Sequence, residues 1–342
     1  MLRLVDLDDI APAVNNPNTS NLIVLNPNYE ERAVTSVELL VQKFKTNNLN
    51  FVVIELRGTR HVDILDERTN TNRDMVIRVF NKRNIRYYSW MIDYPLENLE
   101  IITNHLENSL RKVTPPINLF LDISCMPREL LLRFIEDFKR IYEEEKFLNK
   151  IWILYVWAAR YPNIGYPQTI GAPRGYFNRG IDLRELVPHD AKVMLVIFPG
   201  SQGFEAKQVY DTFSDFNTET YIMFIINQKD PFRSLPTLQA NQILFQLAHS
   251  RDDVFIEYYF TIPDGIRHLS NILNKAMKDY DIFFVAPFGP KPLTVGSFLA
   301  THSFLKKQNS KADIVLLSTF QYTSTYSIGK SELSIFEIDF ST

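Results

Sequence analysis

The chain has 342 residues, of which 45% are hydrophobic, and this length suffices for two domains that each bury a core. A formal net charge of −3 argues against broad nucleic-acid binding and against binding to an anionic membrane surface. The single cysteine excludes an intrachain disulfide. No hydrophobic run is as long as a membrane span, and residues 1–9 do not resemble a signal peptide, so we expect a cytoplasmic protein.

Strands and helices alternate along the first half of the chain. Residues 1–20 predict an irregular N-terminal arm, and the polar stretch from Arg57 to Asn72 predicts an exposed loop. Hydrophobic runs rich in β-branched and aromatic residues predict strands at 22–25, 51–56, 86–92, 118–122 and 151–157. Helical periodicity falls between these runs. This alternation predicts a mostly parallel, doubly wound sheet.

The segment 161–184 interrupts this alternation with prolines, glycines and aromatic residues. We expect it to form a β-hairpin or a lid that closes the first half. The domain boundary is then expected near Pro188, which gives a first domain at 1–188 and a second at 189–342. The second half repeats the alternation from Val193 onward and ends in a C-terminal hairpin whose last strand is at 333–340.

One motif occurs in both halves. Residues 118–128 and 281–291 each contain a buried strand, a turn with a proline next to a basic residue, and the start of an apolar helix. The pair Pro127-Arg128 aligns with Pro290-Lys291. Proline is favoured at the first position of a helix, where its missing N–H has no partner to lose.

Two further motifs recur in the same order. Tyr29-Glu30-Glu31-Arg32 resembles Phe204-Glu205-Ala206-Lys207, with an aromatic residue, a glutamate, any residue and a basic residue. Residues 161–165 resemble residues 326–329. Three repeated motifs predict an internal duplication. The fold class that we expect is α/β, with two tandem Rossmann-like sheets related by a pseudo-two-fold axis.

Ligands of open parallel sheets bind beyond the carboxyl ends of the strands, and all the repeated turns lie at that edge. Helix N-termini and basic side chains there can hold a phosphate or carboxylate group. We therefore predict a nucleotide-type anion in each half, or in one shared pocket. The predicted ligand-binding residues are Asn26, Glu30, Arg32, Asp122, Ser124, Arg128, Ser201, Glu205, Lys207, Gly289 and Lys291. The alternative is that these charges are exposed and the prolines only define the turns.

Acid–base catalysis has three candidates, namely Asp122, Glu30 and His61. Asp122 ends a buried strand, where a carboxylate more often caps the following helix or binds a ligand. His61 follows a strand end between arginines and an aspartate. The histidines lack the spacing of metal ligands, and the glycine-rich loops of dinucleotide and ATP sites are missing, so we expect no metal and no cofactor.

The stretch Phe284–Thr294 resembles the strand-turn-helix motif of CARF domains, the Rossmann-like sensors of prokaryotic antiviral systems. In that family the strand leads into a Gly-Gly-Thr-Lys-type turn and a helix of small apolar residues. Gly289 and Lys291 match this turn, whereas Phe288 replaces a glycine and Pro290 replaces the threonine. The resemblance implies binding of a cyclic oligonucleotide, a partner protein and a role in antiviral defence.

Three functions remain open. The chain could be a binding module for a nucleotide-type anion that acts with a partner protein. It could be an enzyme that acts on a nucleotide or nucleoside, for which two carboxylates converging on a deep cleft would be the sign. It could also be a scaffold subunit without catalytic activity.

Overall fold

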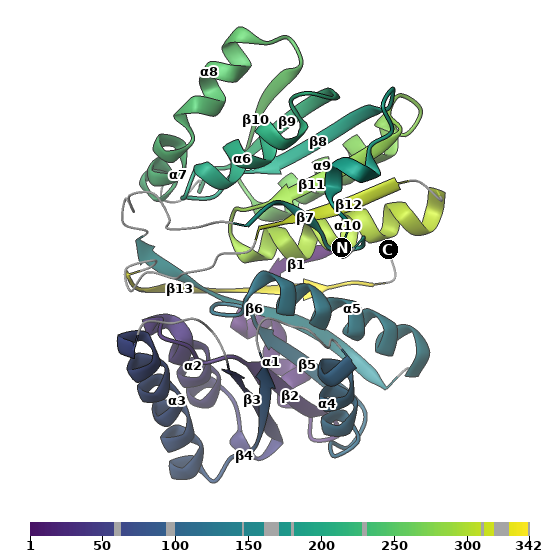
Figure 1. Cartoon of the computed structure of the whole chain (residues 1–342). Coiled ribbons are helices and arrows are strands. Elements are labelled where there is room, and N and C mark those ends of the chain that lie inside the picture. Colours follow the sequence, from purple (N-terminus) through teal and green to yellow (C-terminus); the bar gives the residue numbers. More distant parts are fainter. Residues whose placement is uncertain are drawn as a thin grey trace. The chain divides into compact units, whose positions relative to one another are not determined.

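The computed structural model of the chain describes residues 1–57, 63–93, 100–145, 147–160, 171–178, 181–227, 231–308, 311–317 and 328–340. The chain divides into two compact units. Unit 1 consists of Met1–Arg160 and Tyr322–Thr342, and unit 2 consists of Tyr161–Gln321. Both have the α/β, Rossmann-like fold that the sequence predicts, with helices and strands labelled in Figure 1.

Unit 1 contains a seven-stranded sheet of order β1-β13-β6-β5-β2-β3-β4. Its strands are β1 (Leu2–Val5), β2 (Ser20–Leu25), β3 (Leu49–Arg57), β4 (Arg86–Asp93), β5 (Ile117–Asp122), β6 (Leu148–Arg160) and β13 (Ile328–Ile338). Its helices are α1 (Leu7–Val14), η1 (Glu31–Val34), α2 (Thr35–Lys43), η2 (Thr46–Asn48), α3 (Asp63–Arg83), α4 (Glu100–Leu110) and α5 (Arg128–Glu145).

Unit 2 contains a six-stranded sheet of order β10-β9-β8-β11-β12-β7. Its strands are β7 (Arg174–Gly175), β8 (Lys192–Phe198), β9 (Asn217–Ile225), β10 (Val254–Tyr259), β11 (Ile282–Pro287) and β12 (Lys311–Leu316). Its helices are η3 (Leu183–Leu186), α6 (Phe204–Phe213), η4 (Pro231–Ser234), α7 (Leu235–Ala240), α8 (Gln242–Ser250), α9 (Ile262–Ala276) and α10 (Lys291–Gln308).

The five parallel strands of the two units have the same order. Counted along the chain within each unit, β2–β6 and β8–β12 both follow the order 3-2-1-4-5 of doubly wound folds. The fold class is therefore confirmed, and the shared order agrees with the duplication that the motifs predict. In this order the first and fourth strands are neighbours, and the crevice beyond their carboxyl ends is the usual ligand site.

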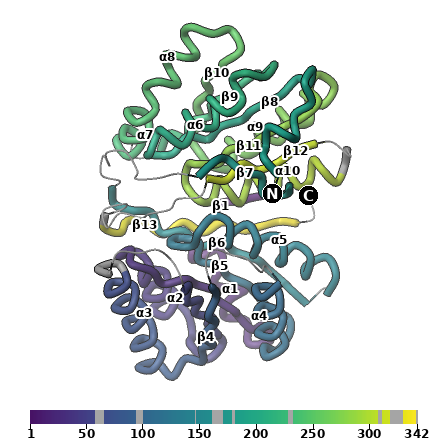
Figure 2. The backbone as a smooth tube through the Cα atoms, viewed as in Figure 1, coloured from purple at the N-terminus to yellow at the C-terminus, as the bar shows by residue number. Residues whose placement is uncertain are grey.

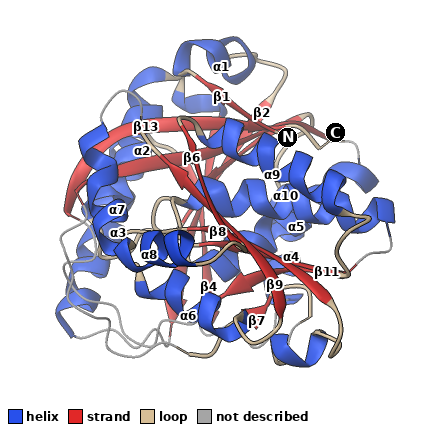
Figure 3. Ribbon diagram, turned by 90° about the horizontal axis from the view of Figure 1, so that it is seen from above, coloured by secondary structure: helices blue, strands red, loops and turns tan. Residues whose placement is uncertain are grey.

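Helices, drawn in blue in Figure 3, pack against the strands, drawn in red. In unit 2, Phe283 contacts Phe304 of α10, whereas its neighbour Phe284 stacks on Phe213 of α6. Because successive residues of a strand point to opposite faces, these two contacts place the two helices on opposite sides of β11. Along the described residues, no helix is long and apolar enough to cross a membrane.

One antiparallel strand of each sheet comes from an unexpected part of the chain. β13 pairs with β6 in unit 1, and β7 pairs with β12 in unit 2. Figures 1 and 2 show the yellow β13 running beside the teal β6. The predicted division into 1–188 and 189–342 is therefore wrong. The chain enters unit 2 after β6, earlier than predicted, and it returns to unit 1 after β12. Hydrophobic alternation predicts a strand but not the sheet that it joins.

Two segments that the sequence predicts to be irregular are regular. The N-terminal arm forms β1 and α1, and the Asp6 backbone N–H donates to the Asp9 carboxylate at 2.9 Å. Residues 63–72 of the predicted loop form the first turns of α3. These turns consist mostly of polar residues, so the sequence shows no helical periodicity of hydrophobic residues there. The helix packs on the sheet further along, through the buried Val76 and Phe80.

Candidate functional site

The switch point of unit 1 lies between β2 and β5, where Leu25 pairs with Asp122. The loops that follow these strands are joined by one side chain. The Asn28 amide nitrogen donates to the Cys125 carbonyl at 2.9 Å, and the Asn28 amide oxygen accepts from the Glu30 backbone N–H at 2.9 Å. Asn28 therefore links the loop after β2 to the loop after β5 by hydrogen bonds.

Arg32 lies inside unit 1 and not at its surface. Its side chain is 1% exposed and forms an ion pair with Glu30 at 2.8 Å. A guanidinium nitrogen also donates to the Val156 carbonyl at 3.0 Å, and the guanidinium lies 5.5 Å from the centre of the Tyr155 ring. The predicted role of Arg32 was to face an anion, but these protein groups surround its charge. Glu30 is buried beside it as the residue before η1.

Asp122 is buried at the end of β5, where it is 4% exposed. The Ser36 hydroxyl and the Ser124 backbone N–H donate to its two oxygens, the latter at 2.8 Å. Burial raises the pKa of this carboxyl above its ordinary value, although the hydrogen bonds from Ser124 and Ser36 oppose the shift. A carboxylate that accepts from the N–H two residues later stabilises a turn. Asp122 thus orders the loop that leads into α5.

The Glu30–Arg32 ion pair and the Asp122 carboxyl group of unit 1 are connected through β6. The Val156 carbonyl accepts from Arg32, and the Val156 N–H donates to the Ser124 hydroxyl at 2.9 Å. A continuous buried network therefore runs from Glu30 to Asp122. We call it the unit 1 network. Buried polar groups that are satisfied in this way hold loops in one arrangement.

Asn26 also lies at this edge and is 5% exposed. Its amide nitrogen donates to the Ile54 carbonyl at 2.9 Å, while its amide oxygen is buried without a hydrogen-bond partner among the described residues. His61, a candidate for catalysis, lies outside the described residues.

The switch point of unit 2 lies between β8 and β11, where Phe198 pairs with Pro287. The backbone N–H groups of Phe288 and Gly289 both donate to the Phe198 carbonyl at 2.9 Å. At Gly200 a Cβ would lie 2.3 Å from the Phe288 carbonyl oxygen, so only glycine fits. Backbone contacts join these loops, whereas side-chain polar groups join those of unit 1.

Arg128 and Lys291 occupy matching places in the two units. Each is the first residue of the helix after the fourth strand, and each side chain is half-buried. The loops before them differ, because unit 1 has residues 123–127 where unit 2 has residues 288–290. The motif therefore aligns the helix starts correctly but not the strands.

The other predicted residues of unit 2 lie in or before α6. Ser201 lies half-buried in the loop after β8, and Glu205 lies in the first turn of α6. Lys207 pairs with Asp211 one turn further along the same helix, at 2.6 Å. Glu205 is inside its helix, whereas Glu30 precedes η1, so these two glutamates do not match in position.

In each unit, an asparagine that no sequence pattern singles out holds the loop after the first parallel strand, which is β2 in unit 1 and β8 in unit 2. In unit 1 the Asn72 amide nitrogen donates to the carbonyls of Asn28 and Glu30, at 2.6 and 3.0 Å. In unit 2 the Asn241 amide nitrogen donates to the Gly200 carbonyl at 2.8 Å. Both asparagines lie in the connection after the second strand of their unit. The two units therefore also share this asparagine-to-backbone contact, which only the fold reveals.

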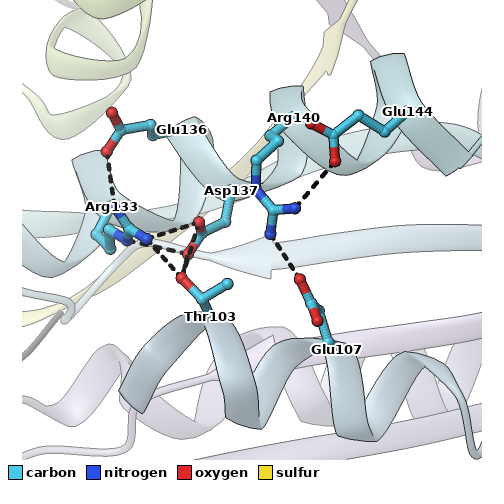
Figure 4. Close-up of polar contacts among 7 residues, drawn as sticks. All are labelled: Thr103, Glu107, Arg133, Glu136, Asp137, Arg140 and Glu144. Atoms are coloured by element: carbon cyan, nitrogen blue, oxygen red, sulfur yellow. Dashed lines mark hydrogen bonds and ion pairs between the residues drawn. The ribbon is translucent and has the colours of Figure 1, made fainter. Parts of the chain in front are cut away.

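A polar cluster fixes α5 on α4 (Figure 4). Arg133 donates to the Asp137 carboxylate at 3.0 and 3.1 Å, and the Thr103 hydroxyl donates to the same group. Burial raises the pKa of Asp137 above its ordinary value, although Arg133 opposes the shift. Further along, Arg140 donates to Glu107 at 2.7 Å. Because these contacts are internal to the helix pair, we assign the cluster a structural role.

The described residues contain no group of three or more His, Cys, Asp or Glu side chains that could hold a metal ion. The carboxylates of Glu30 and Asp122 are both buried and bound by protein groups. A general acid or base must come within hydrogen-bond reach of its substrate. The arrangement of unit 1 is therefore better suited to fixing loops than to proton transfer.

No protein-family model matches the chain, and no curated protein matches it. Among solved structures, phosphoethanolamine N-methyltransferase 1 of Haemonchus contortus is 10% identical with a TM-score of 0.23, over 96% of this chain and 90% of that chain. The cytoplasmic domain of a prokaryotic cation chloride cotransporter is 10% identical with a TM-score of 0.26, over 90% of this chain and 98% of that chain. At such TM-scores, neither likeness bears on function.

Proposed function

We propose that the protein is a non-catalytic binding module for a nucleotide-type anion and acts with a partner protein. One observation carries the proposal. Arg128 and Lys291 begin the helices after the fourth strand in two units of the same strand order. Backbone N–H groups at a helix N-terminus and an adjacent positive side chain together favour a phosphate.

Unit 2 is the better candidate for the ligand. Its strand β11 ends in Pro287, whereas the paired position at the switch point of unit 1 is the carboxyl group of Asp122. A carboxylate at this place repels a phosphate, and a proline does not. We therefore expect one ligand site per chain, at Ser201, Gly289 and Lys291.

The resemblance of Phe284–Thr294 to the CARF motif supports cyclic oligonucleotides as the first ligands to test, and prokaryotic antiviral defence as the process. Catalysis is the second candidate function. It receives less support, because protein groups already bind the carboxylates of Glu30 and Asp122.

The test is calorimetry with cyclic oligonucleotides, linear oligonucleotides and mononucleotides at two salt concentrations. Lys291→Ala should weaken binding about 10- to 100-fold, the value of a hydrogen bond to a charged group, and Lys291→Arg should recover part of the loss. Lys278→Ala is the matched control, because Lys278 is an exposed lysine of the same unit that precedes β11, at the opposite end of this strand from Lys291. Arg128→Ala should have the smaller effect.

Two results would overturn the proposal. One is that none of these compounds binds, which would favour a scaffold subunit. The other is that binding is unchanged by both Lys291→Ala and Arg128→Ala in protein that remains folded. Conversion of a bound nucleotide to a product, lost in Asp122→Asn, would establish the enzyme instead.

A further inference from the structure

The exchange of strands between the two halves of the chain is reciprocal. β13 follows β12 along the chain but pairs antiparallel with β6, from Ile328 opposite Arg160 to Ile338 opposite Ile151. β7 follows β6 along the chain but pairs antiparallel with β12. The fifth strand of each unit is therefore flanked by the segment that follows the fifth strand of the other.

We propose that the chain is a strand-exchanged pair of units fused into one polypeptide, in which the half 1–188 and the half 190–342 are binding partners. Unit 1 needs β13 from the second half, and unit 2 needs β7 and its continuation from the first half. Each exchanged segment fills the open edge of a fifth strand. An unpaired edge exposes a row of backbone N–H and C=O groups that readily bind another strand.

β13 is held in unit 1 by burial and by side-chain bonds. Phe336 is 2% exposed, and the Trp157 indole N–H donates to the Ser334 hydroxyl at 2.9 Å. On the same strand, Glu337 forms ion pairs with Lys150 of β6 and with Arg3 of β1. The strand lies between β1 and β6, one place in from the edge of the sheet, so its removal would open two ladders.

The segment 171–178 is held in unit 2 mainly by one carboxylate and one aromatic ring. The backbone N–H groups of Phe177 and Asn178 donate to the Asp313 carboxylate at 2.8 and 3.0 Å. Tyr176 is 2% exposed, and its ring centre lies 6.0 Å from that of Phe298 on α10. A Cβ at Gly175 would lie 2.1 Å from an Asp313 oxygen, so this position requires glycine. The short β7 is thus only part of a longer attachment.

The test begins with a cut between the halves in the full-length protein. His189 and Asp190 have fully exposed side chains, so a protease site can replace them. After cleavage, light scattering with size-exclusion chromatography should show both fragments in one 1:1 species that separates only in denaturant. Fragments that separate in native buffer would refute the proposal, because each unit would then be complete without the other half.

Two variants show whether the exchanged segments hold the fragments together. Phe336→Ala and Tyr176→Ala should each speed dissociation of the cleaved fragments about 100-fold, as expected for the loss of a buried aromatic side chain. Glu332→Ala, an exposed residue of β13, should change the rate less than about twofold. Circular dichroism before cleavage confirms folding, and Phe336→Leu replaces any Phe336→Ala protein that does not fold. Equal rates for all variants would show that other contacts join the halves.

Discussion

Asp313 is the residue whose loss should most disturb unit 2. It is fully buried on β12, and one oxygen accepts from the Phe177 and Ile314 N–H groups while the other accepts from the Asn178 backbone and side chain. Asp313→Ala leaves these donors without an acceptor. Each buried donor left unsatisfied costs about 1–3 kcal/mol, and partial access of water reduces the sum. We expect a total loss of about 3–5 kcal/mol in the free energy of unfolding.

Asp313→Asn tests the two oxygens of the Asp313 carboxylate separately. The amide oxygen can still accept from the Phe177 and Ile314 N–H groups, but the amide nitrogen would face two donors of Asn178. We expect this variant to lose about 2–3 kcal/mol. Adding Asn178→Asp reverses the side-chain pair and should restore part of the loss. A double-mutant cycle should therefore give a favourable coupling energy between positions 313 and 178.

The assay combines urea unfolding, followed by circular dichroism, with hydrogen exchange. Exchange should increase first in residues 171–178 and in β12. Asp279→Ala is the control, an exposed aspartate of the same unit that should change stability by less than about 0.5 kcal/mol. A stability loss below about 1 kcal/mol for Asp313→Ala would refute the assignment of Asp313 as the anchor of this segment.

Two further predictions concern unit 1. Burial raises the pKa of Asp122 in the folded protein above its ordinary value of 3.8. The protonated carboxyl group therefore adds to the stability of the folded protein below pH 3.8, and this contribution is lost as the pH rises through the folded pKa. Asp122→Asn should therefore gain stability relative to the original protein from acid to neutral pH, and urea unfolding at several pH values that shows a constant difference would contradict this. Arg133→Ala should lower the unfolding free energy by about 2–4 kcal/mol, because Asp137 is left buried without its cation. Arg140→Ala, whose side chain is 39% exposed, should cost less than about 1 kcal/mol in the same assay, and equal losses would contradict the assigned difference in burial.

The sequence predicted the fold class because hydrophobic periodicity and turn residues are local. It predicted a helix after each of the pairs Pro127-Arg128 and Pro290-Lys291 for the same reason. The partners of a strand depend on non-local contacts, so the pattern around Gly175 could not show that it would join β12. The burial of Arg32 was missed in the same way, because Val156 and Tyr155 are distant in the sequence.

The two switch points differ in a way that bears on how a duplicated fold can divide its roles. In unit 1, buried charges and hydroxyl groups bind one another, and the unit 1 network fixes the loops. In unit 2, backbone bonds join the corresponding loops, and Gly200 allows their close approach. A buried network whose polar groups are all satisfied holds its loops in one arrangement. We therefore place the proposed ligand site in unit 2 and assign the unit 1 network a structural role.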